Sequence, residues 1–168
     1  MTDSLSPLQK KYGHQLNGLI DLQSYFIEIS SGEFAGREDV HVNLLSPEQS
    51  VALTEKFCEF HPLFEPLQLL ILDEANTSNY HCYAPGMPIP GAVVYVSHDG
   101  PTKFAFAGLE DFLRAARMAI EADAFLTDFH TAEVLLSHSQ DQLNVLIRKG
   151  FESQEAEEIM LLKLQASD

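Results

Sequence analysis

Ser97, His98 and Asp99 supply, side by side, the three residue types of a hydrolytic triad. In such a triad the histidine accepts the serine proton and the carboxylate orients the histidine, so the three side chains must converge in space. Adjacent residues of an extended strand point to opposite faces, and these three therefore cannot form the relay among themselves. The chain also lacks the G-x-S-x-G sequence that holds a nucleophilic serine in a sharp turn. We predict no catalytic residue and a protein that is not an enzyme.

A metal centre is the second kind of chemistry that the residue types allow. Possible ligands lie in or beside one predicted sheet, namely Asp73, His81, Cys82, His98 and Asp99. Zinc sites usually contain paired ligands such as C-x₂-C or H-E-x-x-H, and neither pattern occurs. His81 and Cys82 would face opposite ways in a strand, so at most one of them could serve a given site. The remaining histidines, His130 among them, are scattered. We predict no metal and no cofactor, with a metal-dependent hydrolase centred on His98 and Asp99 as the alternative.

A polar loop over residues 73–79 offers a different kind of function. Asp, Asn, Ser and Thr side chains bond to their own backbone in tight connections, which accounts for their abundance there. The same loop lies beside two tyrosines, and protein interfaces favour aromatic anchors with adaptable polar neighbours. We therefore predict a partner-binding surface made of Asp73, Glu74, Asn76, Asn79, Tyr80, Tyr83, His98 and Asp99.

The charge of the chain limits its partners. Ten Lys and Arg stand against 25 Asp and Glu, giving a formal net charge of -15. Nucleic-acid binding is not expected, because it uses basic side chains to displace phosphate counterions. A charged partner should be basic, although an acidic surface could also serve solubility alone. The oligomeric state is not predicted.

The length and composition indicate one sizeable core. The chain has 168 residues, of which 45% are hydrophobic. Its first residues contain no apolar signal-peptide region, and no run of about 18 apolar residues occurs, so we expect a cytoplasmic protein without a membrane span. Cys58 and Cys82 are then expected to be reduced thiols.

The elements that must position these residues follow from hydrophobic periodicity. Apolar residues recur at helical spacing over residues 16–29, and strict alternation predicts a short strand over 40–44. Ser46, Pro47 and Gln49 form a capping box that begins a helix to about Phe60. Apolar strands separated by turn residues fill 67–106 and predict an antiparallel meander, with a tight hairpin turn at Asp99-Gly100.

The last third of the chain is predicted to be helical. Acidic residues after Gly108 complement the positive end of a helix dipole, and this helix carries its apolar residues on one side. After about Ala124 the pattern is helical throughout. We predict an α+β domain over residues 1–124 and a small helical C-terminal appendage over 125–168 packed on it.

The order of these patterns resembles that of the SUKH superfamily, which includes bacterial toxin-immunity proteins and fungal cell-wall assembly regulators. The resemblance covers roughly residues 16–118 and is carried by the segments LQSYFIEISSGEF, VHVNLLSPEQ, HPLFEPLQLLILDEANTSNYHCY, GAVVYVSHDG and FAFAGLEDFLRAA. It implies a curved, mainly antiparallel sheet flanked by helices, and a domain that acts by binding other proteins.

The functional expectation combines this resemblance with the charge and with the lack of a reactive constellation. We expect a non-catalytic protein-binding module, an immunity protein that neutralises a toxin, such as a basic toxin domain, by covering its functional surface. A regulatory scaffold without a toxin partner is a further alternative.

Overall fold

The computed structural model describes residues 19–31, 34, 41–58, 64, 67–74, 78–85, 90–98, 102–131, 141, 143–145 and 147–149. The named elements follow in the order α2 (Leu19–Ser31), α3 (Pro47–Cys58), β1 (Leu70–Ile71), β2 (Tyr80–Ala84), β3 (Ala92–Val96), β4 (Lys103–Phe106), α4 (Leu109–Ala122) and the 3₁₀ helix η2 (Leu126–Phe129). Within the described ranges, every helix is too short or too polar to traverse a bilayer.

The four strands form one antiparallel sheet in the order β1-β2-β3-β4. Each strand therefore pairs with its neighbour in the sequence, as expected of a meander. The predicted α+β class and the antiparallel sheet flanked by helices are confirmed. The predicted hairpin turn at Asp99-Gly100 lies outside the described residues, although it falls between β3 and β4, which do pair.

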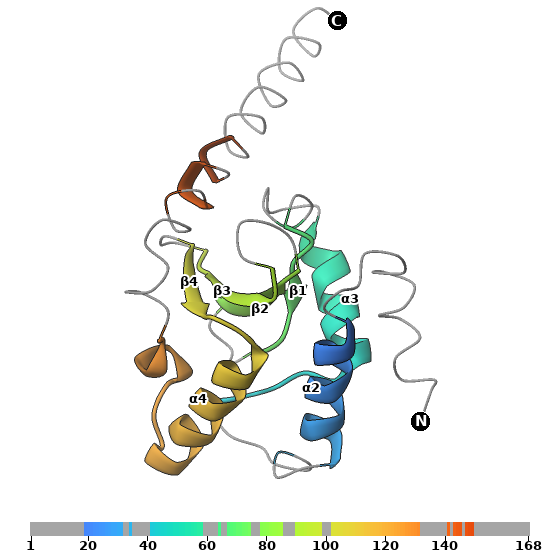
Figure 1. Ribbon diagram of the computed structural model, residues 1–168, viewed down its shortest axis with the longest axis vertical. Helices are drawn as coiled ribbons and strands as arrows, with labels where there is room; N and C mark the ends of the chain where they lie inside the picture. The colour runs from blue at the N-terminus through green and yellow to red at the C-terminus, as the bar shows by residue number, and fades with distance from the viewer. Residues whose placement is uncertain are drawn as a thin grey trace, which may run out of the picture.

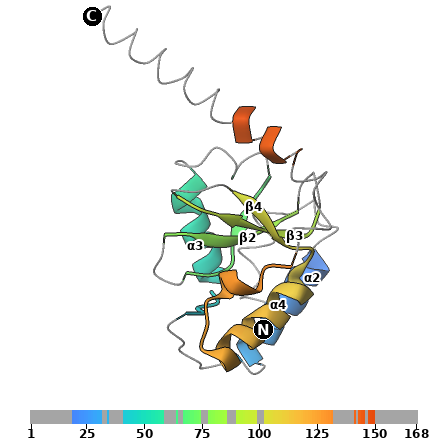
Figure 2. The ribbon, with the colours of Figure 1, turned by 90° about the vertical axis from the view of Figure 1, so that its left-hand side faces the viewer.

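Both faces of the sheet are covered. Helices α2 and α4 lie side by side against one face (Figures 1 and 2) and share a hydrophobic cluster with side chains of all four strands. A second cluster covers the opposite face and includes the fully buried Leu143 from the C-terminal part of the chain. Helix α3 lies beside β1 and contributes Val51 to the first cluster and Phe57 to the second. Side chains on either face of the strands are therefore withdrawn from water.

The start of α3 confirms the capping box. The backbone N–H of Gln49 donates to the hydroxyl of Ser46 at 3.2 Å, and the Ser46 N–H donates to the side-chain oxygen of Gln49 at 3.0 Å. These reciprocal bonds satisfy groups that a helix leaves unpaired at its first turn. Within the described residues 41–45, the strand predicted over 40–44 is limited to an isolated antiparallel bridge between Leu44 and Asp73. Two backbone hydrogen bonds flank this bridge, from Leu45 N–H to the Leu72 carbonyl at 2.9 Å and from Glu74 N–H to the Asn43 carbonyl at 3.0 Å.

A buried hydroxyl of α3 closes the open edge of the sheet. Strand β1 has only two residues, and the backbone N–H of Ile71 donates to Oγ1 of Thr54 at 2.9 Å. Thr54 is fully buried, and its own hydroxyl donates to the Ser50 carbonyl at 2.6 Å. An edge strand presents unpaired backbone groups that can recruit another chain. Helix α3 therefore both packs on the edge and satisfies one of its donors.

The segment after α4 shares the core of the sheet. Asp123 ends α4 in the left-handed conformation at φ 50°, ψ 48°, and Leu126 is buried in the cluster beneath α2 and α4. The backbone N–H of Thr131 then donates to the Ala105 carbonyl of β4 at 2.9 Å. The helical appendage predicted over residues 125–168 stays a prediction, and the described residues 126–131 pack into the main body.

Replacing Thr54 should test the edge bond. Thr54→Val keeps the side-chain shape but leaves the buried Ile71 N–H without an acceptor, so we expect the free energy of unfolding to fall by about 1–3 kcal/mol. Ser50→Ala is the matched control, because the Ser50 hydroxyl is buried on the same helix and has no partner among the described residues. Urea unfolding should show no loss of stability for Ser50→Ala. Equal losses in both variants would contradict this role of Thr54.

Candidate functional site

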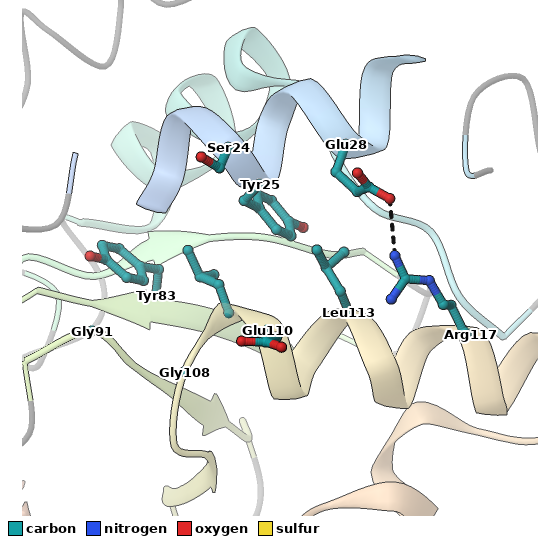
Figure 3. A pocket seen from close by; sticks show the side chains of 10 residues that line it. Ser24, Tyr25, Glu28, Tyr83, Gly91, Gly108, Glu110, Leu113 and Arg117 are labelled. Atoms are coloured by element: carbon teal, nitrogen blue, oxygen red, sulfur yellow. Dashed lines mark hydrogen bonds and ion pairs between the residues drawn. The ribbon is translucent and has the colours of Figure 1, made fainter. Parts of the chain in front are cut away.

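An open pocket lies where α2 and α4 meet the sheet. Its volume is about 520 Å³, which falls in the range of small-ligand sites. The residues that line it come from both helices, from β2 and from the turns before β3 and α4, as Figure 3 shows: Ser24, Tyr25, Glu28, Tyr83, Gly91, Gly108, Leu109, Glu110, Leu113 and Arg117.

Helical spacing explains why the lining residues of α2 form one wall of the pocket and those of α4 form another. Tyr25 and Glu28 are three residues apart in α2, and Leu109, Leu113 and Arg117 recur every four residues in α4. Side chains at such spacings lie on the same face of a helix. The pocket thus combines apolar walls with carboxylates and a guanidinium.

An ion pair joins the two helices at the pocket. Nη2 of Arg117 lies 3.0 Å from Oε1 of Glu28, and the guanidinium carbon is 5.6 Å from the centre of the Phe34 ring. Both side chains are substantially exposed, so the pair contributes little to stability. Its main consequence is that the positive charge of Arg117 is already engaged by Glu28.

Tyr25 is the buried polar group of the pocket. The residue is 2% exposed, and its hydroxyl has no hydrogen-bond partner in the part of the chain that the structure describes. Burial, and then the nearby charge of Asp73, raise the pKa of Tyr25 well above its ordinary value. Tyr25 is therefore a neutral phenol whose hydroxyl is enclosed and is not open to the pocket.

A second cluster of polar groups combines the buried Asp73 and His81 with the half-buried His130. Asp73 accepts two hydrogen bonds from His81: Oδ1 from the backbone N–H at 2.7 Å and Oδ2 from the ring Nδ1 at 3.0 Å. Nε2 of His81 lies 2.8 Å from Nε2 of His130. The rings of Tyr95, Phe106 and Phe112 surround His81, which is 2% exposed. The three polar residues form a chain shielded by aromatic rings.

The hydrogen-bond pattern assigns the protons of this chain. Only one hydrogen fits between the two Nε2 atoms. If the shared hydrogen belongs to His130, the buried Nδ1 of His130 carries an unpaired lone pair. If the hydrogen belongs to His81, the Nδ1 of His130 carries a hydrogen that has no acceptor. A buried N–H group without an acceptor is rarer and costlier than a buried lone pair without a donor. The Nε2–H of His130 therefore donates to Nε2 of His81. This assignment makes His130 neutral.

The electrostatic surroundings of His130 agree with that assignment. Burial lowers the pKa of His130 to about 3 from its ordinary 6.5, with smaller electrostatic contributions from His81 and Lys103. Its Nδ1 is buried as well, so the lone pair does not meet solvent. The hydrogen-bonded series Asp73–His81–His130 resembles a proton relay in its residue types, but it ends at the buried Nδ1 of His130.

The spacing of the two histidines does not suit a shared metal ion. Two nitrogen ligands held roughly 2.1 Å from one tetrahedral zinc lie roughly 3.4 Å apart, whereas these Nε2 atoms are 2.8 Å apart. In the described ranges, no group of three or more His, Cys, Asp or Glu side chains could hold a metal ion. The contact is therefore a hydrogen bond.

The structure divides the predicted partner-binding residues among different environments. Asp73, Tyr80 and Tyr83 are buried. Tyr80 packs against Phe57 on one face of the sheet, whereas Tyr83 reaches the pocket on the other. Alternation along β2, with both faces covered, explains this separation. These residues consequently do not form one continuous exposed surface.

The remaining members of the predicted surface lie near the ends of the strands. The amide oxygen of Asn79 accepts hydrogen bonds from the backbone N–H and Nδ1 of His98, at 3.0 and 2.8 Å. The backbone of Glu74 bonds to Asn43. Asn76 and Asp99 lie outside the described residues, so the hydrolase alternative centred on His98 and Asp99 is not tested by the geometry. The structure brings Asn79 and His98 together.

Sequence reasoning missed the residues that make both clusters. His130 was read as one of several scattered histidines, and it meets His81 across 49 positions of sequence. Tyr25 falls within the helix predicted over residues 16–29, and no local pattern marks it as a pocket residue. No family model, curated protein or solved structure matches this chain. The site is therefore interpreted from its own geometry.

The buried histidine should make stability depend on pH. Because the pKa of His130 is lower in the folded protein than in the unfolded chain, unfolding takes up a proton below pH 6.5, and stability is lost as the pH falls from 6.5 toward 3. His130→Gln can still donate an amide hydrogen to His81 but does not titrate. Urea unfolding at a series of pH values should therefore show a smaller loss on acidification for this variant than for the wild type.

The protonation state of His130 can also be measured directly. The ring signals of His130 in NMR spectra should keep the shifts of a neutral imidazole from pH 6.5 to pH 4. A midpoint near the ordinary value of 6.5, or parallel stability curves for the two proteins, would contradict the assignment.

Proposed function

We propose that this chain is a non-catalytic module that binds another protein, and that it acts as an immunity protein which neutralises a toxin by covering the toxin's functional surface. The observation that carries the proposal is a contrast within the described residues. Asp73 and His81 are buried and His130 is half-buried with an inaccessible Nδ1, whereas the open pocket is lined by apolar side chains, two carboxylates and the Arg117 guanidinium. A surface of this kind is suited to contact.

The charge and the pattern of the fold support the same function. A net charge of -15 speeds encounter with a basic partner and disfavours nucleic acid. The segments that resemble the SUKH superfamily coincide with the helices and strands that build the pocket, from α2 to α4. A cytoplasmic location belongs to the proposal, and it is supported by Cys58 and Cys82, which are both free thiols.

The proposal is tested with the proteins encoded next to this chain. A candidate toxin from a neighbouring gene should co-purify with it, and co-expression should protect cells from that toxin. Because association of oppositely charged proteins is steered electrostatically, the association rate should fall roughly tenfold or more between low and physiological ionic strength. The rate can be measured by stopped-flow fluorescence.

Two results would count against the proposal. The immunity function fails if no neighbouring product binds and no protection is observed. A stoichiometric metal ion in protein purified without chelator, lost in His98→Ala, would favour the hydrolase alternative instead.

A further inference from the structure

The segment that follows α4 covers part of the outer edge of the sheet. We call residues 126–131 the strap; it includes η2, which lies beside α4 (Figures 1 and 2). Leu126 anchors one end of the strap, because it is buried in the cluster shared by α2, α4 and the strands. At the other end, the Thr131 N–H donates to the Ala105 carbonyl of the edge strand β4 at 2.9 Å. The strap therefore satisfies a backbone acceptor that an edge strand would otherwise expose.

A β-bulge accounts for the position of this acceptor. Val93 of β3 pairs with Phe106 of β4. The next residue, Val94, pairs with Phe104, which leaves Ala105 as an extra residue of β4. The extra residue of a bulge is left out of the strand ladder. Its carbonyl is consequently bonded to the strap.

The strap is also held by the contact between His130 and His81, which has room for a single hydrogen. The two Nε2 atoms are 2.8 Å apart, and Nδ1 of His81 bonds to Asp73 at 3.0 Å. One Nε2 must therefore donate while the other accepts. Nδ1 of His130 is buried without a partner among the described residues. The closed strap thus accommodates the two hydrogens of two neutral imidazole rings.

A further proton on either ring is incompatible with this contact. On Nε2 of His81, the added hydrogen would point at the Nε2–H of His130, and the two N–H groups would repel each other. On Nδ1 of His130, it would create a buried cation whose new N–H has no acceptor in the described part of the chain. Proton uptake by the histidine pair therefore requires the two rings to separate.

The groups around His130 do not offset the charge of such a proton. His81 faces it from β2, the ring of Tyr95 lies 5.2 Å away on β3, and Lys103 of β4 adds a positive charge nearby. Asp73 carries the opposite charge, but both of its oxygens already accept hydrogen bonds from His81. Water is the medium in which a charged His130 is stabilised, and opening of the strap brings His130 to water.

We propose that the strap is an acid-released element: uptake of a proton by the histidine pair opens residues 126–131 while the sheet and the helices that cover it stay folded. Opening also uncovers the Ala105 carbonyl at the outer edge of β4. Burial holds the pKa of His130 at about 3 in the closed strap, against 6.5 in water. The equilibrium constant for opening should therefore rise roughly a hundredfold between pH 6.5 and pH 4. This device does not depend on the protein-binding function proposed above.

Amide hydrogen exchange followed by NMR detects rare openings and tests this inference. Thr131 reports on the strap, and Ile71, whose N–H donates to the buried Thr54, reports on unfolding of the whole domain. After correction for intrinsic exchange rates, Thr131 should be less protected than Ile71, and its protection should fall roughly a hundredfold between pH 6.5 and pH 4. Low concentrations of urea should speed exchange at Ile71 but not at Thr131, because a local opening exposes little surface.

Two outcomes in the wild-type protein would overturn the inference. The first is protection of Thr131 that does not change with pH. The second is equal protection and equal urea dependence at Thr131 and Ile71, because the strap would then open only when the whole domain unfolds.

His130→Gln removes the titrating ring from the strap. A glutamine amide can present either its hydrogens or its oxygen to His81, so a proton added to His81 no longer breaks the contact. The protection of Thr131 in this variant should change by less than about threefold over the same pH range. A change as large as that of the wild type would contradict the role of the histidine pair.

His41→Gln is the matched control. It makes the same substitution at a histidine whose ring contacts Phe125, the residue just before the strap. The hundredfold change at Thr131 should persist in this variant, and its loss would overturn the inference. If His130→Gln does not fold, the wild-type comparison of Thr131 with Ile71 still decides between the outcomes.

Discussion

The covering of both faces of a four-stranded sheet is the constraint on which the rest of the structure depends. Once α2 and α4 occupy one face and a second cluster forms on the other, neither set of alternating side chains remains available for a partner. Polar groups on the strands must then be satisfied inside the protein, because an unpaired buried polar group is costly. His81 meets this requirement through Asp73 and His130.

Because both faces of the sheet are covered, the accessible polar side chains around the pocket stand mainly on the helices. The pocket lies between α2 and α4 at the end of the sheet where Gly91 precedes β3 and Gly108 precedes α4, and most of its polar side chains stand on these two helices. A sheet-based loop surface, as the sequence suggested, would have placed recognition at the strand ends. Burial of Tyr80 and Tyr83 instead assigns one tyrosine to the core beside α3 and the other to the pocket.

The two polar clusters differ in the way they are satisfied. In the enclosed chain, Asp73 uses both oxygens on His81, and the shared proton between the histidines leaves only a lone pair unpaired. In the pocket, the ion pair of Glu28 with Arg117 is exposed and the Tyr25 hydroxyl has no partner. Each cluster thus retains one buried polar atom without a partner among the described residues, Nδ1 of His130 in the first and the hydroxyl of Tyr25 in the second. The hydrogen bonds of the first cluster favour a unique packing.

The sequence by itself determined the local features of this protein. The capping box of Ser46 and Gln49, the antiparallel strands and the opposite orientation of His81 and Cys82 all follow from interactions within a few residues, where backbone sterics and nearby hydrogen bonds dominate. Only the tertiary structure decided that His81 meets His130 across 49 positions and that Glu28 meets Arg117 across 89. Such contacts depend on which helices cover which face, and that is set by long-range packing that no local pattern contains.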